Sequence, residues 1–312
     1  MLLEDILGIQ CTDTILMIRP SGFRFNPETS TSNSFQKKPS DSWKNKIHEN
    51  ALLEFDSVVQ RLINERIKVI VYEEQSSDSL PDSIFPNNWI SFHPNRKIIL
   101  YPLQSELRRK ERRNEVLDLV TQRLGITNWD VLDLSSNENK SMYLEGTGSM
   151  VLDRVHKIVY AADSIRTNKE ILAQWASEMG YKIVSFSTNF NGLPVYHTNV
   201  MLTIGVNFAV VCTDIIPDIP ERNTLIRSLE SSGHRIINID IKQMSNFAGN
   251  MLQVQNSSQE SLLLLSDGAA KSLQQEQLSS LSGFTKLVDV AIPTIEDVGG
   301  GSIRCMIAEV FY

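Results

Sequence analysis

Three side chains that could perform nucleophilic catalysis are spread along this sequence of 312 residues: Cys305, His197 and Glu145. Cys305 follows the stretch Gly299-Gly-Gly-Ser-Ile-Arg. Because glycine adopts positive φ and lets a backbone approach a ligand closely, this stretch can present a thiol at the mouth of a pocket. A thiolate nucleophile, an imidazole that transfers protons and a carboxylate that orients the imidazole form a complete set for covalent catalysis. We therefore expect these three residues to be catalytic.

Taken singly, each of these residues also has an ordinary structural interpretation. Cys305 could be a small buried side chain at the start of the apolar strand that follows it. His197 precedes another apolar strand and could be a hydrogen-bonded structural histidine, and Glu145, beside glycines, could be a loop carboxylate. The catalytic interpretation therefore depends on whether the fold brings the three together.

The elements that must position these residues form a repeat of strand, strand, helix and strand. Apolar runs broken by turns predict the strands, and a period of 3.6 residues predicts the helices. The four units have strands at 89–92, 97–101 and 129–134 with a helix at 105–124; at 149–152, 157–160 and 182–186 with a helix at 168–179; at 200–204, 208–212 and 235–239 with a helix at 220–233; and at 251–254, 261–265 and 285–290 with a helix at 269–281. Repeats of about 45 to 55 residues are typical of circular arrays, because one unit cannot bury its own apolar face.

The two ends of the chain supply a fifth unit, which closes the ring and protects the sheet edges at the joint. Its predicted parts are a strand at 303–311, a strand at 12–18, a helix at 51–67 and a strand at 68–72. We therefore predict an α/β fold over 1–312 with a single domain, a five-bladed α/β propeller. A doubly wound parallel sheet is the alternative, disfavoured because hairpins alternate with the crossovers.

The fifth blade would be split between about 303–312 and 12–72, with a long insertion near its beginning. Residues 21–47 within it are rich in Ser, Thr, Asn, Pro and Lys, which favours a loop or lid over a regular element.

In this repeat, unusual polar residues share one register. Asn88, Glu145, His197, Asn250 and Cys305 each precede the first strand of a different blade. The first strands surround the central axis of such a ring, so we expect all five side chains to point at the axis.

Five short motifs occur in order along most of the chain. They are Pro81-Asp-Ser-Ile-Phe-Pro-Asn-Asn88, Leu144-Glu-Gly-Thr-Gly148, Ser164-Ile-Arg-Thr-Asn168, His197-Thr-Asn199 and Gly299-Gly-Gly-Ser-Ile-Arg-Cys305. Each motif is weak alone, but their order and spacing together resemble the guanidine-modifying superfamily. This superfamily has the pentein fold and includes dimethylarginine dimethylaminohydrolase, arginine deiminase and glycine amidinotransferase.

The resemblance implies a hydrolase that acts on a C–N bond of a guanidino or ureido group. Cys305 would attack the central carbon to form a covalent intermediate, and His197 would protonate the leaving amine and then activate water. Glu145 would bind the nitrogens of the planar group, and Arg166 would hold the α-carboxylate of the substrate. The expected substrate-binding residues are Asn88, Arg166, Asn199, Asn250 and Phe85.

Two departures from the superfamily pattern point to the substrate. Asn88 stands where the dimethylarginine enzymes have a carboxylate, and Asn199 stands where arginine deiminases have an aspartate. A buried guanidinium needs compensating negative charge, whereas an amide offers a donor and an acceptor that suit a neutral ureido group. The sequence therefore favours a citrulline-like substrate over an arginine-like one.

Two other functions stay open at this point. An amidinotransferase would use the same Cys, His and carboxylate but would let an amine reach the intermediate before water. A non-catalytic binding protein on the same fold is the second alternative, disfavoured because all three reactive side chains are present.

The composition of the chain limits which classes of binding partner and which cellular compartment we expect. The net charge of −7 argues against nucleic acid or an anionic membrane as the main partner and favours a small molecule. Three cysteines without metal-ligand spacing suggest free thiols, and neither a signal peptide nor a membrane span is expected, so we predict a cytoplasmic protein. We expect no metal and no other cofactor. The oligomeric state stays open.

Some polar residues are expected to face solvent instead. Arg108 or Arg109 could assist Arg166 in holding the carboxylate, but both lie in a run of helix charges, which is typical of a solvated face. The remaining histidines fall in loops, turns or helix ends and are expected at the surface: His48, His93, His156 and His234.

Overall fold

Five small sheets arranged around one axis make up the computed structural model, which describes residues 3–40, 44–75 and 80–312. The sheets are β15 (Ala308–Glu309), β1 (Thr14–Arg19) and β2 (Lys68–Glu73); β3 (Ile90–His93), β4 (Lys97–Leu100) and β5 (Asp130–Asp133); β6 (Val151–Asp153), β7 (Ile158–Ala162) and β8 (Lys182–Phe186); β9 (Leu202–Gly205), β10 (Phe208–Val211) and β11 (Arg235–Asn238); and β12 (Leu252–Gln255), β13 (Ser261–Ser266) and β14 (Lys286–Val290). In every sheet the middle strand pairs antiparallel with the first strand named and parallel with the last.

The antiparallel partners β3, β6, β9, β12 and β15 are the inner strands of the ring. They are short and mostly buried, and β6 lies beside β9, β9 beside β12 and β15 beside β3. Apolar side chains fill the spaces between neighbouring sheets, as in the cluster that joins Ile15 and Met17 of β1 to Leu262 and Leu264 of β13. The predicted five-bladed α/β propeller, closed by strands from both ends of the chain, is confirmed.

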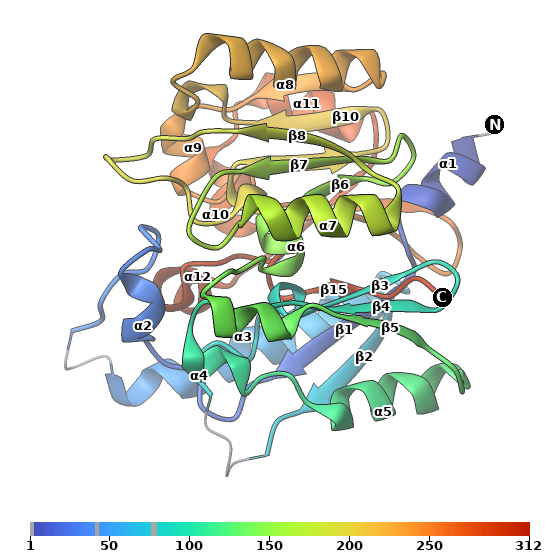
Figure 1. Ribbon diagram of the computed structural model, residues 1–312, viewed down its shortest axis with the longest axis vertical. Coiled ribbons are helices and arrows are strands. Elements are labelled where there is room, and N and C mark those ends of the chain that lie inside the picture. Colours follow the sequence, from blue (N-terminus) through green and yellow to red (C-terminus); the bar gives the residue numbers. More distant parts are fainter. Residues whose placement is uncertain (1–2, 41–43, 76–79) are drawn as a thin grey trace.

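Helices connect the parallel pairs and surround the ring. They are α1 (Leu3–Gln10), α2 (Pro27–Ser30), α3 (Lys44–Asn64), α4 (Glu106–Arg109), α5 (Asn114–Leu124), α6 (Gly146–Ser149), α7 (Lys169–Met179), α8 (Ile219–Ser231), α9 (Ile241–Ser245), α10 (Asp267–Ser272), α11 (Gln275–Ser282) and α12 (Pro293–Gly299), with 3₁₀ turns η1 (Pro86–Asn88), η2 (Ser135–Lys140), η3 (Thr198–Val200) and η4 (Thr213–Ile215). Figure 1 shows α8 at the top and α5 at the bottom of the view, α6 near the centre, and both termini on the side away from α2. None of the helices in the described part of the chain combines the length and apolar character needed to cross a bilayer.

Several predicted boundaries were wrong. The helix expected at 105–124 is broken into α4 and α5, and the one expected at 269–281 is broken into α10 and α11. The strand expected at 303–311 is reduced to β15, because Cys305 N–H donates to Ser302 O and Met306 N–H to Ile303 O, which makes residues 302–306 a turn.

The segment 21–47 is not entirely irregular. It contains α2, and α3 begins at Lys44 rather than near residue 51, while residues 41–43 lie outside the described part of the chain. The N-terminus of α2 is fixed by Asn26, whose side chain accepts a hydrogen bond from Glu28 N–H. Whether this segment acts as a lid stays a prediction.

Candidate active site

Short helical turns deliver the predicted catalytic residues to the ring axis. Asn88 ends η1 just before β3, Glu145 is the N-cap of α6 before β6, and His197 is the N-cap of η3 before β9. A single turn of helix redirects the chain within a few residues, so each side chain projects from the rim of the ring toward its centre. All three are buried.

The glycine-rich stretch forms the wall from which Cys305 projects. Helix α12 ends at Gly300, whose φ of 64° lies in the left-handed region that favours glycine. At Gly299 a Cβ would lie only 2.7 Å from the ring of Phe85, so the close approach there also needs glycine. Tyr196 Oη donates to the Gly300 carbonyl and holds the stretch in place.

One small cavity joins most of the predicted site residues. Cys305, His197, Asn88, Arg166 and Phe85 all line it. Its remaining walls are Thr29, Asn33, Asp82, Arg108, Tyr196 and residues 299–301. The thiol and the imidazole therefore share a cavity, as a nucleophile and its proton carrier must.

Glu145 lies behind His197. Its Oε2 is 2.8 Å from His197 Nε2, and its Oε1 accepts the N–H of Gln104 at 3.0 Å. Although burial opposes its ionisation, Arg166, the His197 hydrogen bond and Arg108 together hold the pKa of Glu145 well below its usual range. Glu145 is therefore ionised and can orient the imidazole. It does not line the cavity, so its expected contact with the substrate nitrogens stays a prediction.

The ionised carboxylate fixes the tautomer of His197. Nε2 must carry the hydrogen that Glu145 accepts, which leaves the Nδ1 lone pair available as a base. Burial lowers the pKa of His197 to about 4, with Glu145 opposing the effect, so the imidazole is neutral at neutral pH. A neutral imidazole can accept the thiol proton.

Two amides contact the sulfur of Cys305. Asn250 Nδ2 lies 3.3 Å and Asn199 Nδ2 lies 3.6 Å from Sγ. Neither asparagine lines the cavity, so their expected role in substrate binding stays a prediction. Burial raises the pKa of the Cys305 thiol, although the Asn250 hydrogen bond, Arg304 and Asn199 oppose the rise. Cys305 therefore rests as a thiol.

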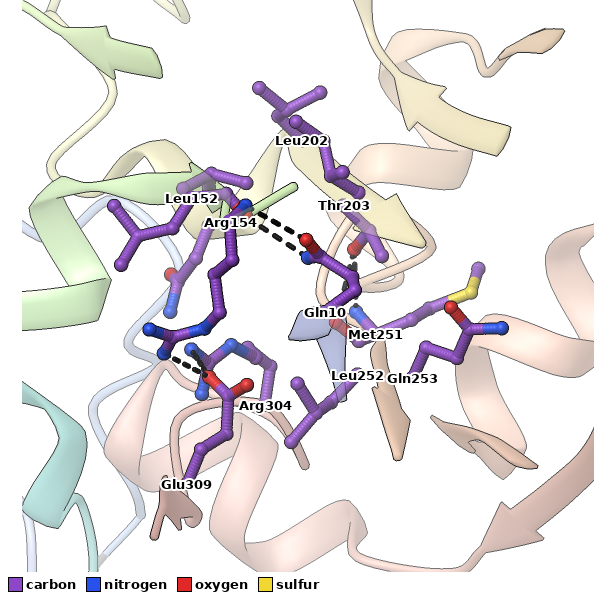
Figure 2. Close-up of a pocket in the computed structure, with 13 residues that line it drawn as sticks. Gln10, Leu152, Arg154, Leu202, Thr203, Met251, Leu252, Gln253, Arg304 and Glu309 are labelled. Carbon is purple, nitrogen blue, oxygen red and sulfur yellow. Dashed lines mark hydrogen bonds and ion pairs between the residues drawn. The ribbon is translucent and has the colours of Figure 1, made fainter. Parts of the chain in front are cut away.

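Figure 2 shows a second polar cavity, whose lining includes Arg154, Arg304 and Glu309. Asn199 also belongs to this lining. Arg304, the neighbour of Cys305, donates to Glu309 Oε2 at 2.8 Å, and Arg154 lies 3.6 Å from the same oxygen. Gln10 of α1 closes this end by bonding to the Leu152 carbonyl and the Arg154 N–H. The strand that follows the nucleophile is thus held by buried ion pairs.

Arg166 and Arg108 both present buried guanidinium groups to the cavity. Arg166 donates to Thr29 O at 3.0 Å and to Ser32 Oγ at 2.8 Å. The expectation that Arg108 faces solvent was wrong: it is only 2% exposed and donates to Asn88 Oδ1 at 2.7 Å and to the Phe85 carbonyl. Arg109, by contrast, turns away and donates to the Leu103 carbonyl. The break between α4 and α5 lets Arg108 point inward.

Sequence reasoning missed Asp82, a buried carboxylate in the wall of the cavity. Its Oδ2 accepts from Asn26 Nδ2 at 2.7 Å and lies 3.9 Å from Arg108 Nε. Its Oδ1 has no hydrogen-bond partner among the described residues. A buried oxygen without a partner at a cavity wall is suited to bind a ligand cation or donor. The motif 81–88 was the available signal, but it gave Asp82 no particular role.

Two further expectations about histidines were wrong. His93 and His234 are only 2% and 6% exposed. His93 ends β3 in an inner hairpin, whereas His234 lies just before β11 and its Nε2 is 3.9 Å from Asp153 of the neighbouring blade. His93 Nε2 lies 2.7 Å from Ser91 Oγ, and burial lowers its pKa, so it is a neutral structural residue. Within the described ranges, no group of three or more His, Cys, Asp or Glu side chains is arranged to hold a metal ion.

The raised pKa of Cys305 predicts how its reactivity depends on pH. Because only the thiolate reacts, its alkylation by iodoacetamide should be slow at pH 7, and thiolate formation alone should raise the rate by about tenfold per pH unit up to pH 9. Peptide mapping by mass spectrometry would separate Cys305 from the buried Cys11 and Cys212. A rate that already reaches its plateau below pH 8 would instead reveal a preformed thiolate.

Comparisons with known proteins agree with this geometry. The model of a family described as "N,N dimethylarginine dimethylhydrolase, eukaryotic" matches residues 19–312. No curated protein matches the chain closely enough to be counted as a relative.

Solved structures share the fold at low sequence identity. ArgZ, an arginine dihydrolase from cyanobacteria, is 15% identical with a TM-score of 0.69, and the match covers 96% of this chain but 40% of that protein. Its N-terminal domain, solved with a covalently bound reaction intermediate, is 16% identical over 95% of this chain and 97% of the domain, with a TM-score of 0.70. Dimethylarginine dimethylaminohydrolase bound to S-methyl-L-thiocitrulline is 16% identical over 96% of this chain and 99% of that one, with a TM-score of 0.63. Together with the family match, the fold and the shared cavity lead to one conclusion: this chain belongs to the N,N-dimethylarginine dimethylhydrolase family of the guanidine-modifying pentein superfamily.

Proposed function

We propose that this protein is a cysteine-dependent hydrolase that cleaves a C–N bond in the ureido group of a small citrulline-like amino acid. The observation that carries the proposal is the orientation of the Asn88 amide. Arg108 has only donors, so the atom of Asn88 that it contacts at 2.7 Å must be the oxygen. The amide nitrogen of Asn88 therefore points away from Arg108.

The Asn88 nitrogen can donate to a substrate oxygen. Nδ2 gives one hydrogen to Asn87 Oδ1 at 3.1 Å and retains a second. A Cβ placed on Gly148 would lie 2.5 Å from this nitrogen and 2.7 Å from His197 Nδ1, so both nitrogens pack against Gly148 and lie near each other. A ureido oxygen accepts such a hydrogen bond, whereas a guanidinium presents only N–H groups there. This arrangement supports a ureido substrate.

The charge around Glu145 favours the same choice. Glu145 lies 3.4 Å from Arg166 Nη1 and 3.9 Å from Arg108 Nη1, in addition to its contact with His197. Its negative charge is therefore already balanced within the protein. The carboxylate in the cavity wall, Asp82, is needed for the ammonium group of the substrate, so a buried guanidinium would need a further one. Without it the desolvation cost is several kcal/mol.

Arg166 and Asp82 in the cavity wall suit the amino-acid part of the substrate. Arg166 can bind a carboxylate through forked N–H donors, and the unpartnered Oδ1 of Asp82 can accept from an ammonium group. The fork of Arg108 is already occupied by Glu111, so Arg108 adds positive charge without a free donor pair. A zwitterionic head group would then be held between Arg166 and Asp82, with its side chain extending toward Cys305.

In the proposed reaction, His197 Nδ1 takes the thiol proton as Sγ of Cys305 attacks the ureido carbon. The C–N bond to the departing amine breaks, and the imidazolium donates its proton to that amine. The group left on Cys305 is a thiocarbamate. Water, deprotonated by His197, attacks its carbon, the C–S bond breaks, and the thiolate of Cys305 takes the proton back from His197. The released carbamic acid then breaks its remaining C–N bond to give an amine and carbon dioxide, so citrulline yields ornithine, ammonia and carbon dioxide. Proton transfer of this kind typically contributes about 10²–10⁴-fold in rate.

Residues 26–36 are proposed to open for substrate entry. Arg166 is bound by Thr29 O and Ser32 Oγ, and Asn33 Nδ2 donates to the Gly300 carbonyl at 3.2 Å. Because a substrate carboxylate would take over the Arg166 donors, binding and the rearrangement of this segment should be linked.

The proposal is tested by comparing L-citrulline, L-arginine and methylated arginines as substrates, with ornithine and ammonia measured as products. Turnover of citrulline with inert arginine supports it, and the reverse result contradicts it. Repeating the reaction with added glycine tests the amidinotransferase alternative, since transfer would yield a glycine adduct in place of ammonia. Mass spectrometry of quenched protein should show the covalent intermediate on Cys305.

Arg166→Lys should raise KM for the amino-acid substrate by about 10–100-fold with a smaller change in kcat, because lysine lacks the forked donor pair. A substrate without the α-carboxylate, N-carbamoylputrescine, should show little difference between the wild type and this variant. Arg109→Lys serves as the control, since Arg109 does not line the cavity. An equal loss with both substrates would show that Arg166 does not bind the carboxylate.

A further inference from the structure

A buried carboxylate holds the turn that carries the nucleophile. Glu296 lies in α12, and its Oε1 accepts a hydrogen bond from Ser302 Oγ at 2.6 Å. Ser302 is fully buried, and its carbonyl accepts the N–H of Cys305 at 2.9 Å. The Glu296 backbone carbonyl also accepts the N–H of Gly300 at 2.9 Å. One residue thus fixes both ends of the glycine-rich stretch.

We propose that Glu296 is a positioning residue for Cys305, acting through Ser302 to hold the thiol at the angle required for attack. The proposal rests on the assignment of Cys305 as the nucleophile under the proposed function. Glu296 does not line the cavity and does not touch the sulfur, so it acts through the turn alone.

The surroundings of Glu296 distinguish it from a carboxylate that only stabilises the helix. That stabilising role belongs to Glu54 of α3, which accepts the N–H groups of Thr294 and Ile295 at the start of α12. Glu296 instead points toward Ser266 and Ser302, and a Cβ on Gly268 would lie 3.4 Å from its Oε2. Its carboxylate therefore points toward the turn at 302–306, which carries Cys305, and toward the neighbouring blade.

Among the described residues that shift the pKa of Glu296, none carries a positive charge that would balance its carboxylate. The groups facing it are the hydroxyls of Ser266 and Ser302 and the carboxylates of Asp297 and Glu54, while Lys37 pairs with Asp297. Burial raises the pKa of Glu296 to about 7; the two hydroxyls oppose this rise, and the two carboxylates add to it.

The hydrogen bond to Ser302 should therefore depend on pH. Above pH 7 Glu296 is ionised and accepts a charge-assisted bond, which is about twice as strong as a neutral one. Below pH 7 the protonated carboxyl group holds Ser302 more weakly. The turn, and with it the thiol, should be best ordered on the alkaline side of pH 7.

The experiment measures alkylation of Cys305 by iodoacetamide between pH 6 and pH 9, which needs no substrate. In the wild type the log of the rate should rise by more than one unit per pH unit around pH 7, since positioning adds to thiolate formation. Glu296→Gln, which keeps an acceptor oxygen, should restore a slope of one while retaining the rate at pH 8 within about threefold. Glu296→Ala and Ser302→Ala should both lower the rate and lower kcat by about 10–100-fold, with little change in KM.

Asp297→Asn is the matched control, because it removes the same charge from the next residue of α12, where the side chain is exposed. It should keep the wild-type rate at pH 8 and a steep slope, with the steep region moved to lower pH because Asp297 contributes to the raised pKa of Glu296. Thermal unfolding separates loss of positioning from loss of folding, and Glu296→Gln remains informative if the alanine variant is unstable. Wild-type rates and slope in both Glu296 variants, or the same change in Asp297→Asn, would overturn the proposal. Normal alkylation behaviour without turnover of any ureido or guanidino compound would contradict the proposed function alone.

Discussion

Cys305→Ser should lower turnover of the true substrate by about 10⁴-fold or more. A serine hydroxyl at this position has no thiolate to attack the ureido carbon, and neutral His197 is too weak a base to ionise it. Loss of a nucleophile in other covalent enzymes has effects of this size or larger, with only positioning and electrostatic contributions left behind. The covalent intermediate should also disappear from the mass spectrum of quenched protein.

Binding should survive this substitution, which makes the test specific. Serine is smaller than cysteine and leaves the amides of Asn199 and Asn250 in place, so titration calorimetry should still detect citrulline binding. Cys212→Ala is the control, since Cys212 is buried at the end of β10 and does not line the cavity. Loss of turnover in that variant at normal stability, or residual activity above about 1% in Cys305→Ser, would contradict the assignment.

The sequence was sufficient to predict the ring because each repeat can be recognised from short stretches of neighbouring residues. Apolar alternation and turns located all five blades, and the shared register of Asn88, His197 and Cys305 predicted that they meet at the axis. Register is robust because a slip of one residue would turn an inner strand inside out.

The one-turn helices were not predictable from the same signals. Elements such as η1, α6 and η3 are shorter than one full period of an amphipathic pattern, so periodicity cannot detect them. They nevertheless decide which way Asn88, Glu145 and His197 point. The turn at 302–306, which removes most of the expected last strand, is fixed by hydrogen bonds within the turn and by the contact of Ser302 with Glu296.

Arg108 and Asp82 show a second limit of sequence reasoning. A run of charges along a predicted helix is usually solvated, but Arg108 is drawn inward by Glu111, which accepts from its Nε at 2.9 Å, and by Asn88. Glu111 is only three residues away in the sequence, but Asn88 lies on η1, and only the fold brings it to Arg108. The sequence shows the local ion pair but not that the pair is buried against Asn88.

Asn88→Asp should reverse the substrate preference. Arg108 would pair with one oxygen of the new carboxylate, and the other would replace the amide nitrogen beside His197. A ureido oxygen would then face an acceptor instead of a donor, while a guanidinium would gain the counter-charge that it lacks in the wild type. We expect the ratio of kcat/KM for citrulline over arginine to fall by about 10³-fold, most of it through loss of citrulline turnover.

Asn87→Asp is the matched control for this substitution, because it adds the same charge one residue earlier. Asn87 is buried but does not line the cavity, and its Oδ1, which accepts from Asn88 Nδ2, would still be an acceptor as a carboxylate. The Asn88 amide should therefore keep its orientation, and the preference should change by less than about tenfold. If both variants shift the ratio equally, the effect is one of general charge; if Asn88→Asp leaves citrulline turnover intact, the amide nitrogen does not contact the ureido oxygen.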